Sequence, residues 1–216
     1  MGRPAKFTRE QLQAAALALV DREGLAGLTM RALGSALGTG AMTLYNYVAT
    51  REELEVLVVE AVIAQAQWST DVQPQWQDEV RDIATAWWGV VRAHPHAIPL
   101  ILTRRSRSPA MFGVSEAMLR ALAKSGRSGS SLLVAFRAVT ALVTGLAQAE
   151  LAGPLAVKAA ESAENAIARF RALSVERFPY LVEIAGAAAH SAPEDEFRDS
   201  LDVLLEGLSQ NRKKVL

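Results

Sequence analysis

One stretch, residues 28–51, constrains the fold of this chain more than any other part of it. It reads LTMRALGSALGTGAMTLYNYVATR, with Thr29 and Thr50 where helix N-caps are expected and Gly38 where a helix is expected to end. This punctuation predicts two short helices joined by a glycine turn and followed at once by a third helix. The arrangement is a helix-turn-helix.

The second short helix is predicted to have an inward edge and an outward face. Leu44 and Val48, four residues apart, form the inward edge. The outward face carries hydroxyl, phenol, amide and thioether groups and no carboxylate. Such groups bond to base edges and phosphates or lie against thymine methyl groups, so this face fits a DNA major groove. The outward residues are Met42, Thr43, Tyr45, Asn46 and Tyr47.

The charge distribution agrees with a DNA contact in this region, although the total charge does not. The chain carries 23 basic and 23 acidic residues, and a net charge of zero by itself argues against a nucleic-acid binder. Residues 1–51, however, contain six basic and three acidic groups. A local excess of this size is enough for a small dimeric module with moderate salt dependence. Residues 1–6 are open to two interpretations, an arm that enters a minor groove or an end with incidental charges.

The same stretch resembles the N-terminal domain of the TetR-type (tetracycline repressor-like) transcriptional regulators, over residues 8–56. The family pattern has a first helix, then G-L-T, an Arg two residues later, A-x-x-L-G, L-Y-x-x-F and a basic residue opening the next helix. Gly40 departs from it, because the family has a capping Ser or Thr there, and Val48 replaces the usual Phe. These departures predict a weaker cap and a smaller hinge residue. The matching residues are Gly27, Leu28, Thr29, Arg31, Ala36, Leu37, Gly38, Leu44, Tyr45 and Arg51.

The resemblance implies an all-α fold in two parts. Residues 1–50 would form a three-helix helix-turn-helix DNA-binding domain, and residues 51–216 a larger helical ligand-binding and dimerisation domain. It also implies a homodimer that binds palindromic double-stranded operator DNA and represses transcription until a small-molecule inducer releases it. Arg51, opening the fourth helix, is expected beside a backbone phosphate, and the alternative is a solvated surface charge. The DNA-contact set predicted in this way is Thr29, Arg31, Ala41, Met42, Thr43, Tyr45, Asn46, Tyr47 and Arg51.

Composition favours helix along the rest of the chain. Half of the residues are hydrophobic, and proline, glycine and β-branched runs are sparse. The apolar run 132–151 is interrupted by Arg137, Gln148 and Glu150, which indicates a buried helix and not a membrane span. Without a signal-peptide core or any cysteine, we expect a cytoplasmic protein that lacks disulfides. Helices are expected over residues 75–93, 97–103, 109–124, 131–152 and 194–208, with 155–171 either a loose helix or part of a long connection.

The larger part is expected to hold a largely apolar inducer, because aromatic and Met side chains around a few polar groups suit such a molecule. Each of these residues also fits an ordinary core position. No metal is expected, since Pro95 separates His94 from His96. Leu100 also stands where the tetracycline repressors have the His that binds the drug's metal ion. The predicted ligand set, with two cavity-edge residues carried over from the resemblance, is Trp87, Trp88, Val91, Thr103, Arg104, Phe112, Met118, Phe136 and Thr140.

The long helix from residue 131 and the last helix are the predicted dimer contact. In the family these positions build a four-helix bundle between subunits. Dimerisation would also place two reading helices in successive major grooves, roughly 34 Å apart. The alternative is that the apolar stripes pack only within one subunit. The predicted contact residues are Val139, Val143, Leu201, Leu204, Leu205 and Leu208.

Other function classes find little support. An enzyme needs a nucleophile with a base, a carboxylate pair or a phosphate loop, and the chain has no G-x-x-x-x-G-K, G-x-S-x-G or H-E-x-x-H motif. A helical protein-interaction adaptor without DNA binding would explain the apolar helices but not the polar outward face. An activator of the same fold stays open. We therefore predict a DNA-binding regulator that is not an enzyme and needs no cofactor.

Overall fold

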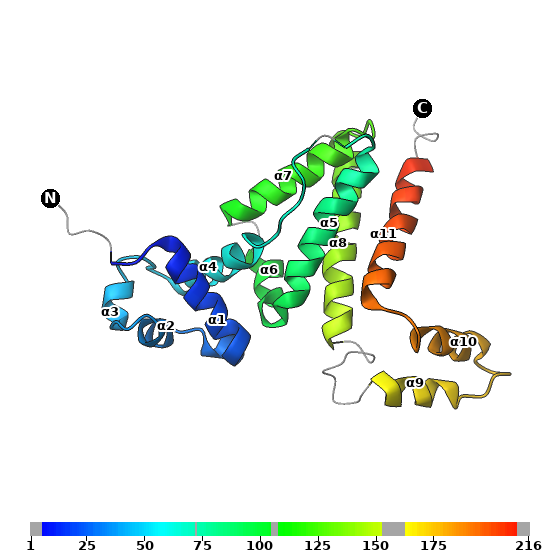
Figure 1. The fold of residues 1–216 in the computed structure, drawn as a ribbon, viewed down its shortest axis with the longest axis horizontal. Coiled ribbons are helices and arrows are strands. Elements are labelled where there is room, and N and C mark those ends of the chain that lie inside the picture. The colour runs from blue at the N-terminus through cyan, green and yellow to red at the C-terminus, as the bar shows by residue number, and fades with distance from the viewer. Residues whose placement is uncertain (1–5, 72, 105–107, 153–162, 211–216) are drawn as a thin grey trace.

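The fold is entirely helical over the part of the chain that this computed structural model describes, residues 6–71, 73–104, 108–152 and 163–210 (Figure 1). The predicted all-α class is thereby confirmed. Within the segment 155–171, a helix begins at Ala163, and residues 155–162 lie outside the described ranges. The elements are α1 (Arg9–Gly27), α2 (Met30–Ala36), α3 (Ala41–Leu44), α4 (Arg51–Ile63), α5 (Trp76–Ala93), the 3₁₀ turn η1 (Pro95–Ala97), α6 (Ile98–Arg104), α7 (Pro109–Ala123), α8 (Gly129–Ala152), α9 (Ala163–Arg171), α10 (Pro179–Ala188) and α11 (Pro193–Gln210).

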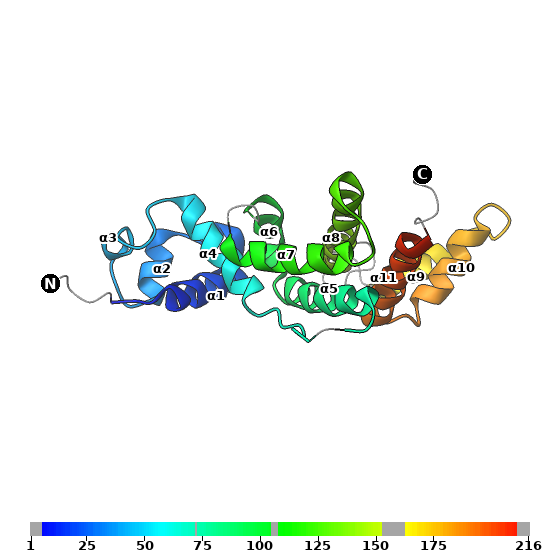
Figure 2. The same cartoon turned by 90° about the horizontal axis from the view of Figure 1, so that it is seen from above.

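Helices α1 to α4 form a compact unit, here called the head, at one end of an elongated molecule (Figures 1 and 2). Helix α1 opens with Thr8 as N-cap and Gln11 completing a capping box. Its backbone leaves helical geometry at Gly24, where φ is 69°. Helix α1 packs along α4, and both contribute fully buried residues, such as Val20 and Val58, to one core.

Helices α5, α7, α8 and α11 pack into a bundle (Figure 1). This bundle, together with η1 and the short helix α6 that follows it, is here called the body. Trp88 of α5 stacks on Phe197 of α11, with ring centroids 4.5 Å apart and ring planes at 11°. Helix α8 contains an apolar segment, Gly129–Ala149, whose length and mean hydropathy of 1.7 would suffice to cross a membrane. One side of this segment enters the body's core through Ala135 and Ala147. Only 33% of its most apolar window is buried, so this helix is less buried in the subunit than predicted.

Helix α4 belongs to both parts, since it packs on α1 in the head and on α5, α6 and α7 in the body. The turn η1 makes a second junction. His94 Nδ1 lies 2.9 Å from an Asp21 carboxylate oxygen, and His96 Nδ1 lies 3.1 Å from the Val20 carbonyl oxygen. Both histidines therefore hold the body against α1. Among the described residues, no group of three or more His, Asp or Glu side chains is placed to hold a metal ion.

Four of the six residues predicted at the dimer contact lie inside the subunit and not on its surface. Val139, Val143, Leu201 and Leu205 are at most 1% exposed, so they lie in the subunit's own core. The remaining two, Leu204 and Leu208, are half-buried. A helix that is apolar nearly all round has no unique inward stripe, so its sequence does not show which side faces a partner. The large apolar side chains that α8 and α11 do expose are Leu133, Val134 and Val203.

Helices α9 and α10 form a hairpin, here called the arm, at the end of the molecule away from the head (Figures 1 and 2). Its two helices pack on each other, and they expose large apolar side chains. The exposed residues of the arm and its connecting turn include Val175, Tyr180, Leu181 and Ile184.

Candidate nucleic-acid interface

A tight turn sets the angle between α2 and α3. Thr29 caps α2, because its hydroxyl oxygen accepts the Ala32 N–H at 3.1 Å. After α2 ends, Gly38 takes a φ of 63°, in the left-handed region that favours glycine. The next N–H, from Thr39, donates to the Gly34 carbonyl at 2.8 Å. The predicted cap and the predicted glycine turn are both confirmed.

Gly34 allows this turn to fold back on α2. A Cβ at this position would lie 2.8 Å from the Thr39 carbonyl oxygen and 3.2 Å from the Ala41 nitrogen. Both are backbone atoms, which cannot rotate away as a side chain can. Sequence reasoning missed this residue. Its position could have indicated its role, because helix propensity disfavours a glycine inside a helix and such a glycine therefore suggests close packing.

The segment predicted to read DNA, residues 41–48, is here called the reading segment. Its inward edge is buried as predicted. Leu44 is fully buried and Val48 is 2% exposed. Helix α3 itself is a single turn that begins at Ala41. Its N-cap, Gly40, offers no side-chain hydrogen bond, as the departure from the family pattern predicts. The chain then continues in a turn over residues 45–47.

The outward side of the reading segment is mixed in exposure. Met42 is 79% and Tyr45 50% exposed, and Asn46 is also exposed. Ala41 and Thr43 are half-buried. Together these side chains present apolar, phenol and amide groups at the tip of the head without a carboxylate among them.

Tyr47 lies differently from the prediction, because it turns toward the N-terminal segment. Its hydroxyl oxygen accepts the Lys6 N–H at 2.7 Å and the Phe7 N–H at 3.3 Å. Its ring meets the Phe7 ring edge to face, with centroids 6.0 Å apart. Tyr47 therefore fixes the start of the described chain beside the reading segment.

Replacing Tyr47 by phenylalanine is expected to loosen this anchor. The variant keeps the ring contact but loses the acceptor of two N–H groups, which costs about 1 kcal/mol of unfolding free energy. Amide hydrogen exchange at Lys6 and Phe7 is expected to accelerate. Tyr45→Phe, which removes an equivalent hydroxyl from an exposed ring, serves as the control. Equal exchange in both variants would contradict the anchoring role.

Arg51 also points inward, and not to the predicted phosphate position. One guanidinium nitrogen donates to the Leu25 carbonyl at 3.0 Å, and another donates to the Leu28 carbonyl. Its Nε donates to Glu55 at 2.9 Å. Arg51 thus ties the start of α4 to the end of α1 and to the connection that leads to α2. Two other predicted contacts, Thr29 and Arg31, are exposed on the head.

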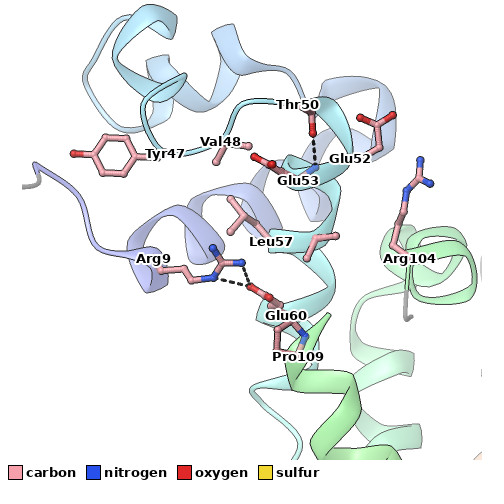
Figure 3. Close-up of a pocket in the computed structure, with 11 residues that line it drawn as sticks. Arg9, Tyr47, Val48, Thr50, Glu52, Glu53, Leu57, Glu60, Arg104 and Pro109 are labelled. Carbon is pink, nitrogen blue, oxygen red and sulfur yellow. Dashed lines mark hydrogen bonds and ion pairs between the residues drawn. The ribbon is translucent and has the colours of Figure 1, made fainter. Parts of the chain in front are cut away.

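A polar hollow of about 890 Å³ lies beside α4, where head and body meet (Figure 3). On one side, Glu60 accepts hydrogen bonds from Arg9 at 2.7 and 2.9 Å and from Gln13 at 2.7 Å. On the other side stands Arg104 of α6, which donates to Glu55 at 2.8 Å. Burial raises the pKa of Glu55, but hydrogen bonds from Arg51 and Arg104 outweigh it and hold that pKa below its ordinary value. Glu55 is therefore ionised at neutral pH.

Comparison with known protein families identifies the family to which this fold belongs. A family model described as "Tetracyclin repressor-like, C-terminal domain" matches residues 70–212. The chain belongs to the TetR family. Proteins of this family are transcriptional regulators and not enzymes, which confirms the predicted class.

Individual relatives agree with this TetR-family assignment. An HTH-type transcriptional regulator of Saccharopolyspora erythraea is 32% identical over 144 residues, which are 67% of this chain and 61% of the relative. An HTH-type transcriptional repressor of Streptomyces coeruleorubidus is 28% identical over 67% of this chain and 54% of the relative. The chain thus matches less than two thirds of either relative's length. The TetR family protein ActR of Streptomyces coelicolor, solved in complex with actinorhodin, superposes with a TM-score of 0.79 over 97% of this chain and 100% of that chain. At 24% identity this likeness shows a shared fold.

The ligand residues predicted for this TetR-family chain divide into two groups. Phe112 is 55% exposed on α7, Thr103 is exposed and bonded to the Pro99 carbonyl, and Arg104 is bound to Glu55. These three lie at the surface or at the junction with the head. The others lie in the core of the body or border it. Phe136 is half-buried, and the buried residues are Trp87, Trp88, Val91, Met118 and Thr140.

Proposed function

We propose that this chain is a sequence-specific DNA-binding transcriptional regulator that reads its operator with the tip of the head. The observation that carries the proposal is the glycine-turned α2–α3 pair, which buries Leu44 and Val48 and leaves Met42, Tyr45 and Asn46 outward. Amide and phenol groups bond to base edges and phosphates, and the Met42 thioether suits a thymine methyl group. The flanking contacts in this proposal are Thr29, Arg31, Ala41 and Thr43.

In this proposal, two residues of the predicted DNA-contact set take other roles. Arg51 acts as a brace inside the head, because its guanidinium bonds to two backbone carbonyls and one carboxylate. Tyr47 acts through the N-terminal segment, which it holds beside the reading face. Its hydroxyl keeps one hydrogen to donate, so a phosphate is within its chemistry.

The regulator is proposed to work as a homodimer, since each head offers a single reading segment and a palindromic operator has two half-sites roughly 34 Å apart. The exposed apolar side chains of α8, α11 and the arm supply a candidate interface. Exposed apolar patches of this kind mark association surfaces in soluble proteins. We further propose repression as the mode of action, in line with the repressor among the relatives, and a cytoplasmic location.

An inducer is proposed to bind in the body among α5, α7 and α8. The Nε1 groups of Trp87 and Trp88 are buried and have no hydrogen-bond partner among the described residues. A buried N–H without an acceptor is costly, so a ligand with carbonyl or phenol oxygens would satisfy both groups within apolar walls. ActR, which shares the fold, was solved with actinorhodin bound, and this supports a small-molecule ligand here.

The function is tested by binding the purified chain to fragments of its own upstream DNA, at two salt concentrations and with excess nonspecific DNA. A specific, salt-sensitive complex with two subunits per site is expected. A folded dimer that forms no complex even at low salt would refute DNA reading and favour an adaptor.

The contact face is tested by Tyr45→Ala. Loss of one base-edge or phosphate contact is expected to weaken operator binding about tenfold, with unchanged helical content and dimer size. Phe112→Ala serves as the control, because Phe112 is 55% exposed on α7, away from the reading segment and outside the proposed interface. Equal operator affinities in the two variants would contradict the proposed face.

A further inference from the structure

Glu55 occupies an unusual position in the middle of α4. It is only 9% exposed, yet it is a charged residue. Its two carboxylate oxygens are used separately: Oε1 accepts from Arg51 Nε at 2.9 Å, and Oε2 accepts from Arg104 Nε at 2.8 Å. One carboxylate thus joins two arginines that are 53 positions apart in the chain.

The two arginines connect Glu55 to different parts of the molecule. Arg104 ends α6, in the body. Arg51 continues to the carbonyl of Leu25, in the last turn of α1, and to that of Leu28, on the connection from which α2 begins. The contacts form an unbroken path from α6 through Glu55 and Arg51 to the backbone that orients the helix-turn-helix.

A second buried carboxylate on α4, that of Glu60, does not connect the head to α6 as Glu55 does. Glu60 is 5% exposed, but its partners, Arg9 and Gln13, both belong to α1. Glu60 therefore holds the head together, whereas Glu55 holds the head to the body. The Glu55 side chain is only 12% exposed, so salt screens its ion pairs less than pairs at the open surface. Removing its charge leaves two partly exposed arginines without their shared partner.

We propose that Glu55 is a positioning residue for operator binding, which fixes the orientation of the head on the body by holding Arg51 and Arg104 at once. The proposal rests on the DNA-binding function proposed above. In a dimer, the distance between the two reading faces depends on this orientation. A head that swivels on its body therefore misses one of the two major grooves.

The sharpest test is Glu55→Gln in the full-length dimer, because charge and positioning predict opposite results. Removing a carboxylate makes the chain more positive, which by electrostatics alone tightens DNA binding. The glutamine amide, however, offers one acceptor oxygen where two arginines need one each, and its NH₂ group faces a donor. We expect operator affinity to fall about tenfold or more, since charge-assisted hydrogen bonds to both arginines are weakened, while affinity for nonspecific DNA stays equal or rises.

Glu116→Gln is the matched control. It makes the same change in charge on α7, at a carboxylate that is 67% exposed. Its operator affinity is expected to stay equal or to rise slightly. Operator affinity in Glu55→Gln that equals the affinity in Glu116→Gln would overturn the proposal.

A distance measurement tests the positioning itself. The chain contains no cysteine, so Ser35→Cys on α2 and Ala123→Cys on α7, both at exposed positions, give two clean sites for nitroxide labels. Labelled chain is mixed with excess unlabelled chain, so that each dimer carries one labelled subunit. Pulsed electron paramagnetic resonance is expected to show a narrow head-to-body distance distribution in the parent and in Glu116→Gln, and a broad one in Glu55→Gln and Arg104→Gln.

Arg104→Lys is expected to restore part of the narrow distribution, because an ammonium group can donate to the same oxygen. Should Glu55→Gln not fold, Arg104→Gln carries the test, since it removes only the body's end of the path. An unchanged distribution in Arg104→Gln would overturn the proposal. If the parent binds no operator but the distributions differ as stated, the proposed function fails and the positioning of the head stands.

Discussion

Replacing Gly34 by alanine is expected to destabilise the head by about 2 kcal/mol and to abolish operator binding. The two energies involved have opposite signs. Alanine is the better helix former by about 0.8–1 kcal/mol, so at an open position in α2 the change would stabilise the protein. Here the added Cβ would lie 2.8 Å from the Thr39 carbonyl oxygen, and such overpacking costs about 1–3 kcal/mol and sometimes more.

The clash at Gly34 also has a functional consequence. The turn can relieve it only by moving away from α2, and this moves Ala41 and the reading segment with it. The measurement is urea unfolding followed by helical circular dichroism, together with operator titration. Gly40→Ser serves as the control: no atom lies within 4 Å of its Cβ position, and a serine there can cap α3, so a gain of a few tenths of a kcal/mol is expected. Increased stability of Gly34→Ala would show that the turn does not approach α2 this closely.

Features that depend on a few neighbouring residues could be predicted from the sequence. Thr29 and Thr50 were each expected to cap a helix, and each side chain accepts an N–H three residues later. Such caps are short-range chemistry, because the hydroxyl and its donor lie within one helical turn. The burial of Leu44 and Val48 was predictable for a similar reason, since helical periodicity fixes which side chains share an edge.

Contacts between distant residues could not be predicted in this way. Tyr47 binds N–H groups about 40 positions earlier in the chain, and Arg51 binds carbonyls 23 and 26 positions earlier. Both side chains were expected at the DNA because their chemistry suits phosphates. That chemistry suits backbone carbonyls and N–H groups equally well, and only the packing of α1 against α4 decides between them. The resemblance to TetR-type regulators fixed the motif but not these partners.

The body shows the same limit for apolar residues. Helix α8 is apolar on nearly every side, so its sequence did not distinguish the core-facing Val139 and Val143 from the exposed Leu133 and Val134. Trp87 and Trp88 were correctly grouped with the apolar interior, but the stack on Phe197 depends on α11, more than 100 residues later. Predicting it requires knowing how the helices are placed.

This stack leads to the second large expected effect. Trp88→Ala is expected to lower the unfolding free energy by about 3–5 kcal/mol, because it empties a buried aromatic volume between α5 and α11. Trp88 is 5% exposed, packs face to face on Phe197, and lies under the Arg92 guanidinium, whose central carbon is 5.0 Å from the ring centroid. For a chain of this length, the loss corresponds to a fall in melting temperature of about 6–20 °C.

Trp88→Phe separates the stack from the indole N–H. Phenylalanine keeps an aromatic face for Phe197 and removes a buried N–H that has no partner among the described residues. The lost apolar area and the relieved desolvation then offset each other, so the expected change in unfolding free energy is within about 1 kcal/mol. Thermal unfolding of both variants by calorimetry measures the difference. A Trp88→Phe variant as unstable as Trp88→Ala would show that a phenyl ring cannot replace the indole in the stack and that the full indole volume holds α5 to α11.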